Sequence, residues 1–204
     1  MKSLREIYRI GLGPSSSHTM GPSNAADIFK NRTTDAAKYR VTLYGSLALT
    51  GRGHLTDYAI KTALSPRECE FVWIQNKELP LHPNGMFFEA LDLSGKVIDE
   101  WTVYSIGGGA LMDKPGGLKT EEVYPFSKMS ELLKRCENEG KTIWNFVDQY
   151  EGPEIWDYLR EVLAVMKKSI DRGLDAEGVL PGGLNLARKA SSYYTRTIQS
   201  KGFL

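Results

Sequence analysis

Cysteine is scarce in this sequence: a chain of 204 residues holds only Cys69 and Cys136. They lie far apart and in no spacing that is typical of a metal site, so we interpret both as buried or idle thiols. The alternative is that they are metal ligands. The sequence therefore argues against any metal site built on several cysteines of this chain.

An excess of charge of either sign is also missing, because 26 Lys and Arg residues nearly cancel 25 Asp and Glu residues. No basic stripe interleaved with aromatic residues is present, so neither nucleic acid nor a membrane surface is an expected partner. The chain contains no apolar run of about 18 residues and no secretory signal at its start. We expect a soluble, cytoplasmic protein.

The order of helical and strand patterns predicts an α+β fold, a mostly antiparallel sheet with helices packed on one side. Alternating apolar and polar residues predict strands at 39–46, 70–75, 86–91 and 97–106. Apolar residues at a spacing of three or four predict helices at 4–10, 22–31, 56–64, 130–139, 142–150, 153–172 and 189–199. Thr56 is expected to cap the helix at 56–64, and Gly173 to end the helix at 153–172.

Residues 11–22, GLGPSSSHTMGP, are the most informative stretch. They offer the hydroxyl groups of Ser15, Ser16, Ser17 and Thr19 and the imidazole of His18 directly before a predicted helix that has Pro22 near its start. Exposed amides and the dipole at such a helix start favour a carboxylate or phosphate. The alternative is an ordinary Ser-rich turn.

All three histidines of the chain stand beside glycine-rich or Ser-rich turns. His18 lies in the Ser-rich loop, His54 follows Gly51–Arg52–Gly53, and His82 precedes Pro83–Asn84–Gly85. An imidazole that titrates near neutral pH can transfer a proton or bind a carboxylate. We expect His54 and His18 to line an active site, whereas a surface or capping role remains the alternative for each histidine.

Three consecutive glycines, Gly107, Gly108 and Gly109, follow the last predicted strand. They allow a positive φ and a close approach of the backbone to a ligand or to another part of the chain. A tight bend at the end of the sheet is the alternative. They form no dinucleotide-binding motif, because no G-x-G-x-x-G opens a helix here.

The Ser-rich loop resembles the N-terminal signature of the iron–sulfur-dependent L-serine dehydratases, in their β portion. Four further segments are similar to that family and occur in the expected order: YGSLALTGRGHLTD at 44–57, LPLHPNGM at 79–86, YSIGGGA at 104–110 and DRGLDAEGVLPGGL at 171–184. The resemblance implies a fold like that of the serine dehydratase β domain. It also implies conversion of L-serine to pyruvate and ammonia on a [4Fe–4S] cluster, without pyridoxal phosphate.

That resemblance divides the chain and assigns its candidate residues. Residues 1–152 would be the β domain, 153–188 a long helix and a linker that contains Leu180–Pro181–Gly182–Gly183, and 189–204 the start of a catalytic α portion that is otherwise absent. Since two cysteines cannot supply the ligands of a cluster, the cluster is expected in the α portion.

The expected catalytic residues of this chain are His54 and His18. The expected substrate-binding residues are Ser15, Ser16, Ser17, Thr19, His82, Asn84, Gly107, Gly108 and Gly109, and no residue is expected to bind a metal. The expected partners are the α portion, in the same chain or as a separate subunit, L-serine, and a second copy in a homodimer.

Two other functions fit the same residues. β portions of this family resemble a small-molecule-binding domain of some phosphoglycerate dehydrogenases, so the loop could sense L-serine or an anion and regulate a partner. A purely structural dimerisation domain, in which the glycines serve close backbone approach, is the third reading. The sequence does not decide between L-serine and L-threonine as substrate.

Overall fold

The computed structural model describes residues 1–115, 122–180 and 185–201, which pack as two compact units. The sheet unit is built on residues 11–115. The helical unit is built on residues 1–10, 122–180 and 186–201. Each unit has its own hydrophobic core, and all the signature residues that carry hydroxyl or imidazole groups belong to the sheet unit.

The sheet has five strands in the order β2-β1-β3-β4-β5, and all neighbours except one pair are antiparallel. Its strands are β1 (Lys38–Tyr44), β2 (Glu68–Ile74), β3 (Gly85–Leu91), β4 (Val97–Gly107) and β5 (Ala110–Met112). The parallel pair is β1 and β2, and it requires a long crossover, which α2 (Gly45–Thr50) and α3 (Thr56–Leu64) provide. The predicted α+β class with a mostly antiparallel sheet is confirmed.

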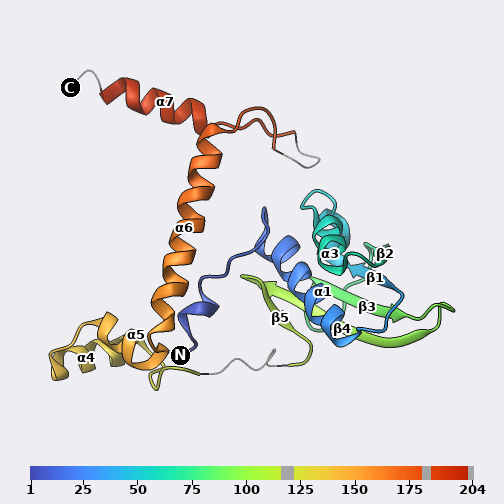
Figure 1. Ribbon diagram of the computed structural model, residues 1–204, viewed down its shortest axis with the longest axis horizontal. Coiled ribbons are helices and arrows are strands. Elements are labelled where there is room, and N and C mark those ends of the chain that lie inside the picture. The colour runs from blue at the N-terminus through green and yellow to red at the C-terminus, as the bar shows by residue number, and fades with distance from the viewer. Residues whose placement is uncertain (116–121, 181–184, 202–204) are drawn as a thin grey trace. The chain divides into compact units, whose positions relative to one another are not determined.

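Helices α1 (Gly21–Arg32) and α3 lie side by side over one face of this sheet (Figure 1). Phe29 of α1 is fully buried, and its ring contacts Tyr39, Phe88 and Trp101 of the sheet. Burial of these large side chains is the main favourable term for the unit, because each aromatic ring removes a large apolar area from water. The placement of helices on one side was also predicted.

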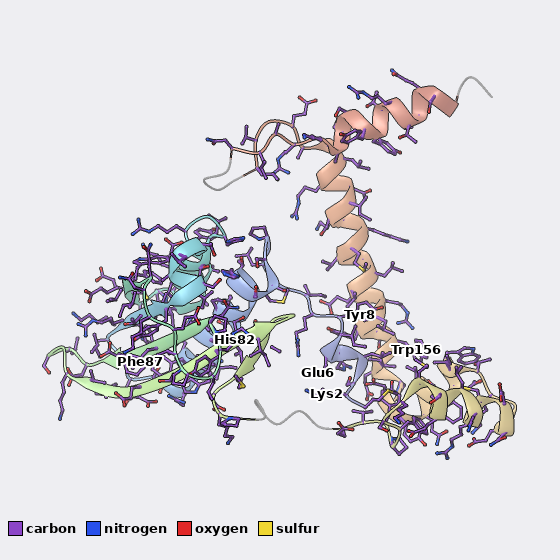
Figure 2. All side chains as sticks on the ribbon, turned by 180° about the vertical axis from the view of Figure 1, so that it is seen from behind. Lys2, Glu6, Tyr8, His82, Phe87 and Trp156 are labelled. Atoms are coloured by element: carbon purple, nitrogen blue, oxygen red, sulfur yellow. The ribbon has the colours of Figure 1, made fainter. Side chains whose placement is uncertain are left out.

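The helical unit consists of a 3₁₀ turn η1 (Leu4–Glu6), α4 (Met129–Glu139), α5 (Ile143–Glu151), α6 (Glu154–Asp175) and α7 (Ala190–Lys201). A small core of Tyr124, Phe126, Leu132 and Phe146 joins α4 and α5 to the segment before them. Figure 2 shows Lys2, Glu6 and Tyr8 of the first residues near Trp156 of α6, and the Tyr158 hydroxyl donates a hydrogen bond to the Tyr8 carbonyl.

Two sequence predictions on the helices are wrong. Helix α6 does not end at Gly173 but continues to Asp175, because a single glycine inside a helix costs only about 1 kcal/mol relative to alanine. The helix expected at 4–10 is a single 3₁₀ turn, in which the Glu151 carboxylate accepts bonds from the Ser3 hydroxyl and the Leu4 amide. Of the predicted linker motif at 180–183, only Leu180 lies among the described residues.

The start of α1 packs closely against the end of β4. A Cβ atom at Gly21 would lie 2.1 Å from the Ser105 hydroxyl oxygen and 2.9 Å from the Ser105 Cβ. Ser105 is fully buried, and its hydroxyl has no hydrogen-bond partner among the described residues. The pair therefore sets how closely α1 approaches the sheet, and only a glycine fits at position 21.

We predict that Gly21→Ala lowers the free energy of unfolding by roughly 1–3 kcal/mol, the usual cost of overpacking. In a Ser105→Gly background the same substitution should cost markedly less, because the conflicting atoms are gone. Urea denaturation of the four chains of this double-mutant cycle measures both values. An equal cost of Gly21→Ala in both backgrounds would contradict the close packing of Gly21 on Ser105.

Candidate functional site

Four of the five signature segments converge at one end of the sheet. The register pairs Leu43 with Met86 and Gly85 with Tyr104, so the end of β1, the start of β3 and the end of β4 lie together. Residues 45–46, 82–84 and 105–109 extend from these strand ends. The chain thus gathers segments that are up to about 90 residues apart at one edge, where loops on a rigid scaffold commonly carry function.

The Ser-rich loop forms a turn of π-helix, η2 (Ser16–Met20), that leads directly into α1. Ser15 caps this turn, since its side-chain oxygen accepts a hydrogen bond from the His18 amide at 3.2 Å. The helical segment therefore begins earlier than the sequence predicts, and the serines lie at its start. Single π turns of this kind occur often at functional sites.

His18 and His54 are brought together by the fold, with ring centroids 4.9 Å apart. His18 comes from η2, and His54 from the turn between α2 and α3. Leu55, next to His54, adopts a left-handed conformation with φ of 58°. Such a conformation is rare for a bulky residue and is held in place only where the surroundings fix it.

Both ring nitrogens of His18 contact hydroxyl groups. The Ser17 Oγ lies 2.9 Å from Nδ1, and the Ser46 Oγ lies 3.1 Å from Nε2. Burial lowers the pKa of His18 below its ordinary value, the charge of His54 lowers that pKa further, and a hydrogen bond with the Ser46 backbone partly opposes both. His18 is thus a neutral, hydrogen-bonded imidazole at neutral pH.

His54 has a different environment. Its Nδ1 lies 3.0 Å from the Thr50 carbonyl oxygen, which can only accept a hydrogen bond. Neutral His54 therefore carries its proton on Nδ1 and has its lone pair on Nε2. Of the two histidines, His54 is the one whose geometry suits a proton acceptor.

The hydroxyl groups of the Ser-rich loop are not equivalent. Ser16 is exposed, whereas Ser15 and Ser17 are half-buried, with their side-chain oxygens 3.4 Å apart. Thr19 is fully buried, and its hydroxyl donates to the His54 carbonyl oxygen at 2.8 Å. The three serines, unlike Thr19, therefore have hydroxyl groups that are at least partly exposed to solvent.

The His82 loop lies at the same end of the sheet. The Asn84 amide donates to His82 Nδ1 at 3.1 Å, and the Asn84 side chain donates to the Ser105 carbonyl at 3.2 Å. The Ser46 amide donates to the Pro83 carbonyl at 3.2 Å, which joins this loop to the residue that contacts His18. Figure 2 shows His82 within the sheet unit.

Gly107, Gly108 and Gly109 all have positive φ values, of 99°, 58° and 75°. The Gly109 carbonyl accepts a hydrogen bond from the Asn24 side chain of α1 at 3.0 Å, and a Cβ atom at Gly109 would lie 2.7 Å from the Met20 sulfur. These glycines therefore allow the turn after β4 to pack closely against the end of η2.

Ser46 and Thr56 contact His18 but were not among the predicted site residues. Thr56 was expected to cap α3, and this prediction is wrong: the cap position is Leu55, and the Thr56 hydroxyl donates to the His18 carbonyl at 2.5 Å. The available signal was the similarity of His18–Thr19 and His54–Leu55–Thr56, in which each histidine is followed closely by a threonine.

The residues of this chain do not fit a [4Fe–4S] cluster. Cys69 belongs to the sheet unit and Cys136 to the helical unit, and burial raises the pKa of the Cys69 thiol to about 12. Among the described residues, no group of three or more His, Cys, Asp or Glu side chains could hold a metal ion. None of the helices in the described ranges combines the length and the apolar composition that crossing a bilayer requires.

A comparison with protein families matches residues 3–76 and 67–115 to the family described as "Serine dehydratase beta chain". The matched region covers more than half of the chain and includes the paired histidines, the His82 loop and the three glycines. This chain belongs to the serine dehydratase beta chain family. The resemblance inferred from the motifs is confirmed.

The curated relatives that the chain matches are named L-serine dehydratase. The chain is 34% identical to L-serine dehydratase 1 of Escherichia coli over 98% of its own length and 55% of the relative. It is 33% identical to the L-serine dehydratase of Streptomyces coelicolor, with the same coverage, and 31% identical to that of Helicobacter pylori over 95% of the chain and 53% of the relative. The chain thus spans about half the length of the curated relatives that it matches.

The lowered pKa of His18 predicts a pH dependence of stability. The unfolded chain, in which the imidazole has its ordinary pKa of 6.5, binds protons more readily than the folded chain. The contribution of His18 is therefore complete above pH 6.5 and is lost as the pH falls below it toward the folded pKa.

We predict that the decline in unfolding free energy from about pH 7.5 to about pH 5.5 is shallower in His18→Gln than in the parent chain, as measured by urea denaturation. Thr62→Ala, which changes an exposed residue that carries no titrating group, is the control, and its slope should equal that of the parent. A His18→Gln slope equal to the parent's would show that folding does not perturb this imidazole.

Proposed function

We propose that this chain is the β portion of an iron–sulfur L-serine ammonia-lyase, which converts L-serine to pyruvate and ammonia. The observation that carries the proposal is the His18–His54 pair, which two separate signature segments bring to a centroid distance of 4.9 Å. The names of the curated relatives support L-serine as the substrate. The proposed cluster belongs to an α portion, since the cysteines of this chain do not fit one.

In this proposal His54 accepts the α proton of L-serine at Nε2. The α proton is weakly acidic, so the reaction needs a base that is neutral near physiological pH and free to accept a proton. Loss of the β-hydroxyl group then gives aminoacrylate, and water converts aminoacrylate to pyruvate and ammonia. His18, which stays neutral, would contribute a hydrogen-bonding imidazole beside His54 without adding a second positive charge.

The substrate carboxylate would bind at the start of η2. Ser15, Ser16 and Ser17 lie at this N-terminal end of the helical segment, where free amide groups and the helix dipole favour an anion. Thr19, a further candidate of this loop, would support this part of the site from below, since its hydroxyl is buried and donates to the His54 carbonyl. His82, Asn84 and the glycines 107–109 lie in loops at the same end of the sheet, so we keep them as further substrate-binding candidates.

The α portion would also cover the apolar face of α6. Leu163, Met166 and Ile170 recur on one side of this helix and are each at least half exposed, although residues 155 and 162 of the same face are buried. Figure 1 shows α6 extending from α4 and α5 toward α7 within the helical unit. The proposed assembly is a cytoplasmic homodimer that uses no pyridoxal phosphate.

A second candidate is a regulatory module that binds L-serine or an anion and performs no catalysis. The cysteines of this chain do not fit a cluster, and this favours the regulatory module. Without a cluster, the chain alone would bind L-serine but would not convert it. The two functions differ in the assembled protein: only the first requires that the histidine pair affect turnover.

We predict that His54→Ala lowers kcat for pyruvate formation by 10²- to 10⁴-fold in the enzyme assembled from this chain and its α portion, the usual contribution of a general base. Thr62→Ala, on the exposed side of α3, is a control that should keep the parent rate. A His54→Ala rate within twofold of the parent would refute the proposed role of His54.

We predict that Leu163→Asp combined with Ile170→Asp weakens binding of the α portion at least tenfold, because both changes place a charge on the apolar face of α6. The control is Ala164→Asp, which adds one negative charge at an exposed position about 100° around the helix from Leu163, off the line of Leu163, Met166 and Ile170. Sedimentation velocity of mixtures of the two portions measures the affinity. Unchanged binding by the double variant would remove α6 from the proposed interface.

A further inference from the structure

The segments that carry the two histidines are joined by a pair of reciprocal hydrogen bonds. The Thr19 hydroxyl donates to the His54 carbonyl at 2.8 Å, and the Thr56 hydroxyl donates to the His18 carbonyl at 2.5 Å. Both threonines are fully buried. Each histidine is therefore held at its backbone by a threonine from the segment of the other histidine.

The His18 carbonyl cannot accept the amide four positions on, because that residue is Pro22, which has no N–H group. The His54 carbonyl precedes Leu55, the cap of α3, and so lies outside the hydrogen bonds of that helix. The threonine hydroxyls donate to these two carbonyls, and a buried carbonyl without a donor would be costly.

The same bonds explain the strained backbone beside His54. Leu55 stands between His54 and Thr56 and has a φ of 58°. That conformation turns the chain so that the His54 carbonyl and the Thr56 hydroxyl both face η2. The two hydrogen bonds anchor the residues on either side of Leu55 and so oppose its return to a more common conformation.

We propose that Thr19 and Thr56 are positioning residues that fix the imidazoles of His18 and His54 at their observed separation. Neither hydroxyl is required to touch the substrate for this role. The catalytic use of the pair rests on the proposed function, but its geometry belongs to this chain alone. Within the described residues, His54 is the charged group that acts on the pKa of His18.

The test follows the ring nitrogens by NMR in the ¹⁵N-labelled chain. The chain contains three histidines, and His82 is an internal reference because it lies outside the pair. For a centroid distance of 4.9 Å in a water-like medium, one charged ring shifts the midpoint of the other by about 0.6 pH unit. We compare the parent with Thr19→Val, Thr56→Val and the double variant.

In the double variant, at least half of this midpoint shift should disappear, and the two rings should lose their close contact. The His82 midpoint should stay unchanged. Thr19→Ser and Thr56→Ser, which keep the hydroxyl groups, should retain the parent behaviour. The matched control is Thr33→Val, which removes another buried hydroxyl that donates to a helix carbonyl, that of Phe29, at 2.7 Å. It should leave all three midpoints unchanged.

A folded double variant that keeps both midpoints and the ring contact would overturn the proposal. If that variant does not fold, NMR of the parent chain provides the test. Slowly exchanging hydroxyl protons of Thr19 and Thr56 would support the proposal, and rapid exchange of both would overturn it. Because the measurement uses no L-serine, its failure is distinct from a failure of the proposed function, which would appear as unchanged turnover in His54→Ala.

Discussion

The candidate site depends on the close packing of one helical turn, η2, against the turn that follows β4 and the start of α3. Glycines make this packing possible, because a side chain at Gly21 or Gly109 would collide with Ser105 or Met20. Once η2 is in place, His18 meets His54, and both Ser17 and Ser46 reach the ring of His18. The paired histidines are therefore a consequence of backbone approach at the end of the sheet.

Much of the fold could be predicted because its strands and most of its helices have strong local patterns. The alternation from Tyr39 onward and the helical spacing at 130–139 locate β1 and the end of α4 within a residue or two. The signature motifs also indicated the family of the chain and predicted that His18 and His54 share a site. Those inferences rest on residue type and order, which the sequence contains directly.

Other features could not be predicted, because they depend on contacts between distant segments. The π turn at Ser16–Met20 and the left-handed Leu55 are backbone states that no local pattern indicates. Thr56 has a residue type that suits a helix cap, but its hydroxyl finds the His18 carbonyl instead. The proton position on His54 likewise follows from the Thr50 carbonyl, which is visible only once the chain is folded.

In the proposed function this chain supplies hydroxyls, imidazoles and a helix start to a site whose cluster is bound by the α portion. That proposal is most directly tested by purifying the protein from its source cells under strictly anaerobic conditions and measuring the mass and iron content of the complex. We predict an iron- and sulfide-bearing species, either a longer chain or a partner bound to this one, that forms pyruvate from L-serine. A colourless chain of 22.8 kDa that is alone and inactive would contradict the account.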